Sequence, residues 1–321
     1  MPLGSAPLAR APKALAAATM LFLAACEVAP PPEPMPPPTA PKARPERIAT
    51  PALPPVSQEL RAYYQAAQDE LLAQGMMRTD RGGPDAPFNE RQLIENFVQI
   101  ALYDEYSRIG GRLVARPVPS RLRRWEQPVR MSVIFGETVP AAQQARDRAE
   151  IGRYTQRLAE LTGLSIQKTE ADANFHVLIL NEEERRAFAP RLRELVPGID
   201  DMALRTITGL PRQTFCVVFS FSRGGASTYA HAIAVVRAEH PDLLRQSCIH
   251  EELAQGLGLA NDSPLARPSI FNDNEEFALL THHDELLLQM LYDPRLRPGM
   301  TEATARPILQ VIARELMGGE S

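Results

Sequence analysis

Residues 248–262 have the sequence CIHEELAQGLGLAND, and this stretch decides how the chain is interpreted. Its residues fit a helix in which successive side chains turn by about 100°. One side of that helix is apolar and carries Ile249, Leu253 and Leu257. Glu251 and Gln255 fall nearly opposite, and His250 lies at the margin of the apolar side. The pattern predicts a helix that packs on a core with one face and presents polar groups to a cleft with the other.

The segments before this helix alternate between strand and helix patterns. Alternating apolar residues predict a strand within 123–136, and apolar runs predict further strands at 174–180, 214–222 and 228–239. A long amphipathic helix is expected at about 140–162, and a charged helix after the second strand. This order indicates an α+β fold, a mixed sheet with helices packed on it.

Two helices are expected ahead of the sheet. Residues 57–74 place apolar and aromatic side chains on one helical stripe. Asn89 followed by Gln92 has the form of a capping box for a second helix, 90–107. Tyr103–Tyr106 is interpreted as the solvated end of that helix, so the region resembles a helical hairpin.

The first 25 residues have the form of a secretory signal. Arg10 and Lys13 precede the apolar run 14–25, which is too short to span a membrane. The run ends in LAAC, so small residues lead into Cys26, the arrangement that lipoprotein signal peptidase requires. This predicts an acylated Cys26 that anchors the chain to a membrane; the alternative is an ordinary signal with a chance cysteine.

The segment after Cys26 is rich in proline. Twelve of the 26 residues from Pro30 to Pro55 are proline, which leaves few backbone donors and no core. Such a composition favours a semi-rigid polyproline tether. We therefore expect an envelope lipoprotein that faces the bacterial periplasm and whose globular part stands away from the bilayer.

Charge and cysteine content narrow the function further. Removal of 1–25 leaves 33 basic and 39 acidic residues, a net charge of −6, so no nucleic-acid partner is expected. Besides Cys26 the chain has only Cys216 and Cys248. Outside the cytoplasm such a pair often forms a disulfide, the alternative being two separate buried thiols.

The decisive helix resembles zinc-protease motifs in two alignments. His250 and Glu251 begin H-E-x-x-H, but Ala254 stands where the second histidine is required. If Gly258 is aligned with the glycine of the longer metzincin motif H-E-x-x-H-x-x-G-x-x-H, Glu252 takes the general-base position. The ligand positions then fall on Glu251, Gln255 and Asn261.

The resemblance extends over about 125–296 and implies a metzincin-like zincin fold with a degenerate site. Thr281 with Asp284 forms a further capping box ahead of the last helix of that region. The segments RRWEQPVRMSVIFG and DELLLQMLYDPRLRPGM, with the decisive helix, resemble a proteobacterial family known only as domain of unknown function 2927. The predicted organisation is a signal peptide (1–25), a tether (26–56), a helical N-terminal region (57–122) and a zincin-like domain (123–321).

The implied ligand set argues against tight zinc binding. Glutamate, glutamine and asparagine supply hard oxygen donors, whereas zinc prefers nitrogen and sulfur. We therefore expect no resident cofactor. One alternative is calcium, for which further carboxylates are available from Asp262, Asp273 and Glu275. The other is zinc held by an unusual set such as His250, Glu251 and His282 or His283, although these last two are interpreted as solvated residues.

Three functional hypotheses follow. The first is a catalytically impaired domain that binds a peptide or envelope partner in the former substrate cleft. The second is an active metal-dependent peptidase or other hydrolase with Glu252 as the base and His250 or Glu251 among the ligands. The third is a purely structural envelope protein. If the zincin interpretation holds, Glu251, Glu252 and Gln255 converge on a groove beside an edge strand.

Overall fold

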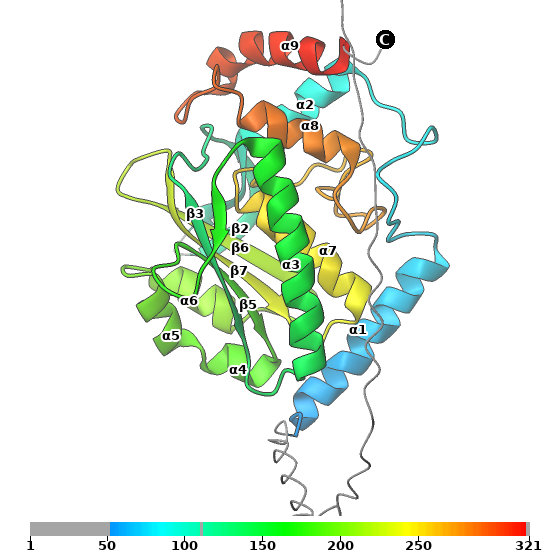
Figure 1. The fold of residues 1–321 in the computed structure, drawn as a ribbon, viewed down its shortest axis with the longest axis vertical. Helices are drawn as coiled ribbons and strands as arrows, with labels where there is room; N and C mark the ends of the chain where they lie inside the picture. The colour runs from blue at the N-terminus through cyan, green and yellow to red at the C-terminus, as the bar shows by residue number, and fades with distance from the viewer. Residues whose placement is uncertain (1–51, 110–111, 319–321) are drawn as a thin grey trace, which may run out of the picture. The chain divides into compact units, whose positions relative to one another are not determined.

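The computed structural model describes residues 52–109 and 112–318 of the chain (Figure 1). The predicted signal peptide, most of the tether and Cys26 lie outside these residues. Within the described part, no helix has the length and apolar character that crossing a membrane requires.

A five-stranded mixed sheet has the order β4-β3-β5-β7-β6 (Figure 1). The strands are β3 (Val129–Phe135), β4 (Ile166–Lys168), β5 (Phe175–Leu180), β6 (Cys216–Ser222) and β7 (Tyr229–Arg237). Strands β4, β3, β5 and β7 pair in parallel, whereas β6 pairs antiparallel with β7 at one edge. The mixed sheet of an α+β fold, predicted from the sequence, is confirmed.

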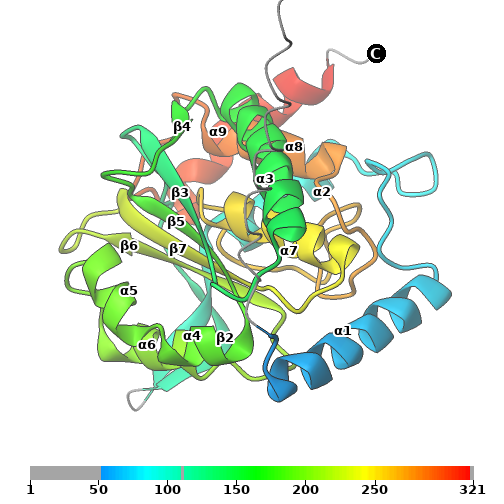
Figure 2. The same cartoon turned by 60° about the horizontal axis from the view of Figure 1, so that its bottom comes forward.

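Helices cover both faces of the sheet (Figures 1 and 2). One face carries α3 (Ala141–Thr162) and α7 (Asp242–Gln255). The other carries α4 (Glu182–Ala187), α5 (Ala189–Leu195) and α6 (Asp201–Thr208).

Strand β5 shows why two helical layers are needed. Its side chains alternate between the faces, and all of them are buried. Phe175, Val177 and Ile179 join the core under α3 and α7, while Leu178 and Leu180 join the smaller core under the other helices.

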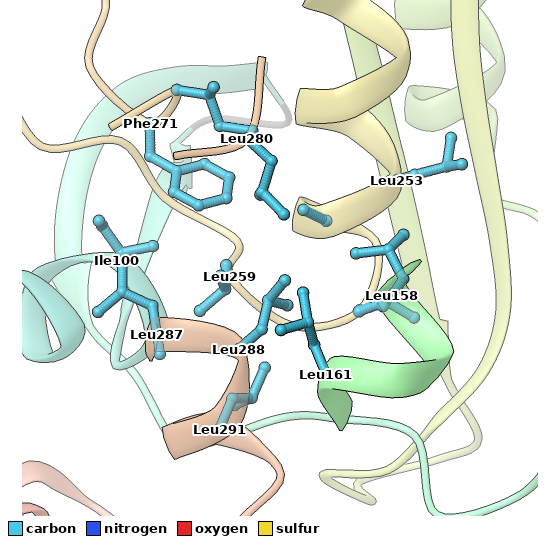
Figure 3. Packing of buried hydrophobic residues seen from close by; sticks show 14 of the residues in the cluster. Ile100, Leu158, Leu161, Leu253, Leu259, Phe271, Leu280, Leu287, Leu288 and Leu291 are labelled. Atoms are coloured by element: carbon cyan, nitrogen blue, oxygen red, sulfur yellow. The ribbon is translucent and has the colours of Figure 1, made fainter. Parts of the chain in front are cut away.

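The larger core also includes residues of three helices that precede or follow the sheet in the sequence. They are α2 (Glu90–Ala101), α8 (His282–Leu291) and α9 (Glu302–Gly318). Figure 3 shows Leu287, Leu288 and Leu291 of α8 gathered with Ile100 of α2 and Leu161 of α3. The first helix, α1 (Pro55–Ala73), adds a satellite cluster around Tyr64.

Both predicted capping boxes are present. The Asn89 side chain accepts a hydrogen bond from Gln92 N at 3.0 Å, and Gln92 Oε1 accepts one from Asn89 N. The Thr281 hydroxyl and the Asp284 carboxylate make the equivalent pair at the start of α8. These local signals are read correctly because each depends on residues three positions apart.

The predicted second helix, 90–107, is wrong beyond Ala101. Tyr103–Ile109 forms strand β1, which pairs antiparallel with β2 (Arg112–Pro119). The segment Tyr103–Tyr106 is therefore not a helix end. Its conformation is set by pairing with β2, a contact that helical periodicity does not reveal.

Candidate functional site: an acidic groove along an edge strand

A groove of about 1710 Å³ follows β6. Strand β6 forms one side, and the last turns of α7 form another. We call this space the β6 groove. The groove joins a set of carboxylates to the outer edge of β6, which pairs with no other strand among the described residues.

The structure brings three of the sequence-derived candidates together. Glu251, Glu252 and Gln255 all line the β6 groove beside the edge strand. They do so because Ile249, Leu253 and Leu257 are fully buried and fix the rotation of α7. Glu252 is only 3 % exposed, so its carboxylate lies at the deep side of the groove.

Asn261 lies elsewhere. Its side-chain Nδ2 donates to the carbonyl of Gln99 at 2.7 Å, and its backbone N–H donates to Ile100 O at 3.1 Å. Asn261 is thus bound to the end of α2. Asp262 lines the groove instead, and its Oδ1 accepts a hydrogen bond from Gln255 Nε2 at 3.0 Å.

His250 is turned away from the groove. Its Nδ1 accepts a hydrogen bond from the backbone N–H of Leu280 at 3.1 Å, and its Nε2 lies 3.0 Å from Glu150 Oε1. An accepting Nδ1 places the proton on Nε2, which then donates to Glu150. The ring also stacks on Tyr154. Both nitrogens are therefore used in holding α7 to α3 and to the segment before α8.

The remaining candidate histidines do not approach the groove either. His283 was expected to be solvated, but it is completely buried, with Nε2 3.0 Å from Asn96 Nδ2 of α2. His282 is partly exposed. His176 is a packed histidine of β5, as expected, with Nδ1 2.8 Å from Ser132 Oγ.

Two further carboxylates reach the groove from the loop between α7 and α8. Asp273 and Glu275 line it together with the α7 residues. We define the acidic cluster as Glu251, Glu252, Asp262, Asp273 and Glu275.

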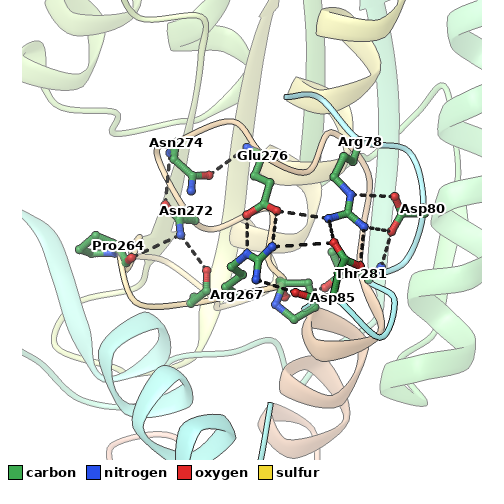
Figure 4. A network of polar contacts seen from close by, with 12 residues as sticks. Arg78, Asp80, Asp85, Pro264, Arg267, Asn272, Asn274, Glu276 and Thr281 are labelled. Carbon is green, nitrogen blue, oxygen red and sulfur yellow. Dashed lines mark hydrogen bonds and ion pairs between the residues drawn. The ribbon is translucent and has the colours of Figure 1, made fainter. Parts of the chain in front are cut away.

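A polar network fixes the loop that carries Asp273 and Glu275 (Figure 4). Glu276 binds Arg267 through two hydrogen bonds of 2.7 and 2.8 Å, and it also contacts Arg78. The backbone of this loop pairs with Met77 and Arg78. Glu276 therefore faces cations, whereas its neighbour Glu275 faces the groove.

The electrostatics of the acidic cluster favour uptake of positive charge. Burial raises the pKa of Glu251 well above its usual range, and the charges of Glu252 and Asp262 raise it further. Burial, with the charge of Asp273, raises the pKa of Glu275 to about 7. A proton or another cation relieves the repulsion in each case.

Cys216 and Cys248 are joined by a disulfide, with Cα atoms 5.8 Å apart. The bond links β6 to α7 at the acidic end of the groove, where Cys216 Sγ lies 4.0 Å from Glu251 Oε2. Cys216, Glu251 and Glu252 form a group of donor atoms within 4.8 Å of one another among the described residues. The sulfur is committed to the disulfide, however, so it is not a thiolate ligand.

The donor set in the groove does not fit zinc. It consists of carboxylates and one amide, while the imidazole of His250 is engaged on the far side of α7. Catalytic zinc sites use nitrogen or sulfur ligands for most positions.

Arginines mark the opposite end of the groove. Arg121 and Arg123 line it together with Asp104, whose carboxylate binds Arg123 at 2.6 Å. Sequence patterns gave no sign of these arginines, because they lie in an irregular segment before β3 that only the tertiary fold brings to the groove.

The mixed sheet, the helices on both faces and the groove along the antiparallel edge strand define an α+β domain with a polar surface cleft. A family model described as "Protein of unknown function (DUF2927)" matches residues 90–311. The chain belongs to this family. No curated protein matches it.

Proposed function

We propose that this protein is a cell-envelope lipoprotein that binds an extended peptide or a partner segment in the β6 groove without cleaving it. One observation carries the proposal. Strand β6 pairs with β7 on one side only, no described strand covers its other side, and all seven of its residues are partly exposed. An open strand edge offers backbone groups with which an added strand can pair.

A zincin-like ancestry of the domain is part of the proposal. The antiparallel position of β6 at the sheet edge and the course of α7 beside it support the resemblance to metzincins. The donor set supports impaired catalysis, since a general base at Glu252 would need a metal-bound water to activate.

The alternative is an active metal-dependent peptidase. The position of Glu252, deep in the groove beside Glu251, favours it. In that case the metal would be held by oxygen donors of the acidic cluster, a set that suits calcium better than zinc.

Hydrogen–deuterium exchange tests the binding proposal. The mature lipoprotein in detergent is mixed with peptides released from envelope proteins by limited proteolysis. We expect slower exchange of the β6 amides and unchanged peptide masses. Peptide cleavage that a chelator abolishes would favour the peptidase. No protection and no cleavage with any envelope fraction would favour a purely structural protein.

Membrane attachment through Cys26 has a separate test. The mature chain is expected to carry lipid on Cys26, which intact-mass spectrometry of the detergent-extracted protein would detect. Cys26→Ser should carry no lipid, with the signal either left uncleaved or cut at another position. A wild-type protein that begins at another residue and carries no lipid would contradict the lipoprotein prediction.

A further inference from the structure

We propose that the β6 groove selects extended peptides that carry a cationic side chain at one end and an anionic group about six residues away. This inference rests on the proposed peptide-binding function and specifies its ligand. Opposite charges lie at the two ends of the open strand edge.

The cationic subsite lies at the Cys216 end of β6. There, Glu251, Asp273 and Glu275 form no ion pair with any arginine, lysine or histidine among the residues described. The neighbouring carboxylate of Glu276, in contrast, forms ion pairs with Arg78 and Arg267. For these three carboxylates, therefore, no cation comes from the described part of the chain.

A lysine or arginine side chain of a bound peptide would supply a cation to these carboxylates. Its charge-assisted hydrogen bonds to carboxylates are stronger than those between neutral groups. It would also replace the proton that repulsion within the acidic cluster otherwise favours. A neutral side chain at the same place would provide no such charge-assisted hydrogen bonds, so the cluster discriminates against it.

The anionic subsite lies at the Ser222 end. Ser222 pairs with Tyr229, whose N–H donates to Arg124 O at 3.0 Å, and this places the segment with Arg123 beside the end of the strand. Arg123 is already paired with Asp104 at 2.6 Å. The free cation at this end is therefore Arg121, which donates to Gly299 O at 3.1 Å and forms no ion pair among the described residues. A planar guanidinium is suited to binding a carboxylate side chain or a peptide C-terminus.

The length of β6 sets the spacing between the two charges. Cys216 and Ser222 are six residues apart along the strand. At roughly 3.3 Å per residue this corresponds to about 20 Å. A peptide that pairs with the strand edge must therefore carry its opposite charges about six residues apart to reach both subsites.

The test uses fluorescent nonapeptides with Lys and Glu six residues apart, made in both orders on a neutral Ser/Thr/Val background. Binding to the mature lipoprotein in detergent is measured by fluorescence anisotropy at low salt. We expect one order to bind, and we expect replacement of its Lys by Gln to weaken binding at least tenfold. Shortening the spacing to three residues should weaken it similarly.

Protein variants provide matched controls. Asp273→Asn with Glu275→Gln should remove the preference for Lys over Gln, while Glu315→Gln, an exposed change far from the groove, should leave it intact. Equal binding of charged and neutral peptides, with β6 amides still protected, would overturn the charge inference alone. Absence of any protection would overturn the proposed function as well.

Calcium provides a further discriminating arm. If calcium binds alone with 1:1 stoichiometry and the double variant abolishes that binding, the acidic cluster is a cation site and the inference is overturned. If calcium only weakens peptide binding gradually, as sodium does at equal ionic strength, the effect is screening and the inference stands.

Discussion

The imidazole of His250 lies flat against the ring of Tyr154, with centroids 3.9 Å apart and planes inclined by 9°. The Tyr154 hydroxyl also donates to the carbonyl of His250 at 2.8 Å. The histidine that makes the sequence resemble a zinc protease is therefore a packing residue between α7 and α3.

Substitutions of His250 should affect stability and leave the groove unchanged. His250→Ala leaves the N–H of Leu280 without its acceptor and removes a partner of Glu150. We expect this variant to lose about 2–4 kcal/mol of unfolding free energy. His250→Asn can keep the acceptor for Leu280 and should lose less. Urea denaturation measures both values. A folded His250→Asn protein that had lost metal or peptide binding would contradict this assignment.

Metal content is the second prediction. Protein purified without chelator or histidine tag should hold no stoichiometric zinc, because the groove offers only oxygen donors. Inductively coupled plasma mass spectrometry measures the molar ratio of zinc to protein. About one zinc per chain that survives dialysis and disappears in Glu251→Gln would show that the carboxylates bind zinc after all.

The Glu275 carboxyl should make stability depend on pH. Its pKa is about 7 in the folded state, against about 4.3 in an unfolded chain. Between these values the folded state holds more protons, so the free energy of unfolding falls as pH rises and the loss is complete above about pH 7. Glu275→Gln should be more stable than wild type at pH 8, by on the order of 1 kcal/mol after solvent screening, and about equal at pH 4.

Glu276→Gln is the matched control for that measurement. Hydrogen bonds from Arg267 lower the pKa of Glu276, so its carboxylate stabilises the fold above the unfolded pKa and loses this effect as pH falls. The variant should be less stable than wild type at pH 8. If the free energy of unfolding at pH 8 changed in the same direction in Glu275→Gln and Glu276→Gln, the expected difference between the two carboxylates would be contradicted.

Loss of the disulfide should destabilise the domain substantially. Cys216 and Cys248 are 32 residues apart, and closing a loop of this size is worth about 3–4 kcal/mol in the chain-entropy model. Cys216→Ser and Cys248→Ser should lower the unfolding free energy by similar amounts under oxidising conditions. Guanidinium denaturation with and without reductant checks this, since reduced wild type should match both variants. A reduced wild type as stable as the oxidised form would contradict it.

Local patterns predicted much of the fold. The capping residues Asn89 and Thr281 and the apolar face of α7 depend on neighbours within one helical turn, and they were identified correctly. Strand β5 was visible as an apolar run because both of its faces are covered. The hairpin of β1 and β2 was missed because its stability comes from cross-strand pairing.

The groove was only partly visible in the sequence. Helical geometry placed Glu251 and Gln255 on one face of α7. Whether Asn261 or Asp262 lies beside them in the groove depends on the turn after α7. Gly258 has φ +129°, and a β-carbon at this position would collide with the carbonyl of Arg123, so only glycine fits the turn. The turn directs the chain so that Asn261 binds α2 and Asp262 meets Gln255. Such a turn is a tertiary property, and a linear motif cannot report it.

The position of the disulfide gives the groove an uneven rigidity. At the Cys216 end, β6 and α7 are covalently joined, whereas at the other end a 3.4 Å hydrogen bond from Ser220 Oγ to Gly256 O links them. We therefore expect changes in groove width to be smallest beside the acidic cluster and largest near Ser222. A ligand group bound at the rigid end loses less binding energy to ordering the protein. That end is therefore preorganised to discriminate between ligand side chains, whereas the other end can accept varied sequences.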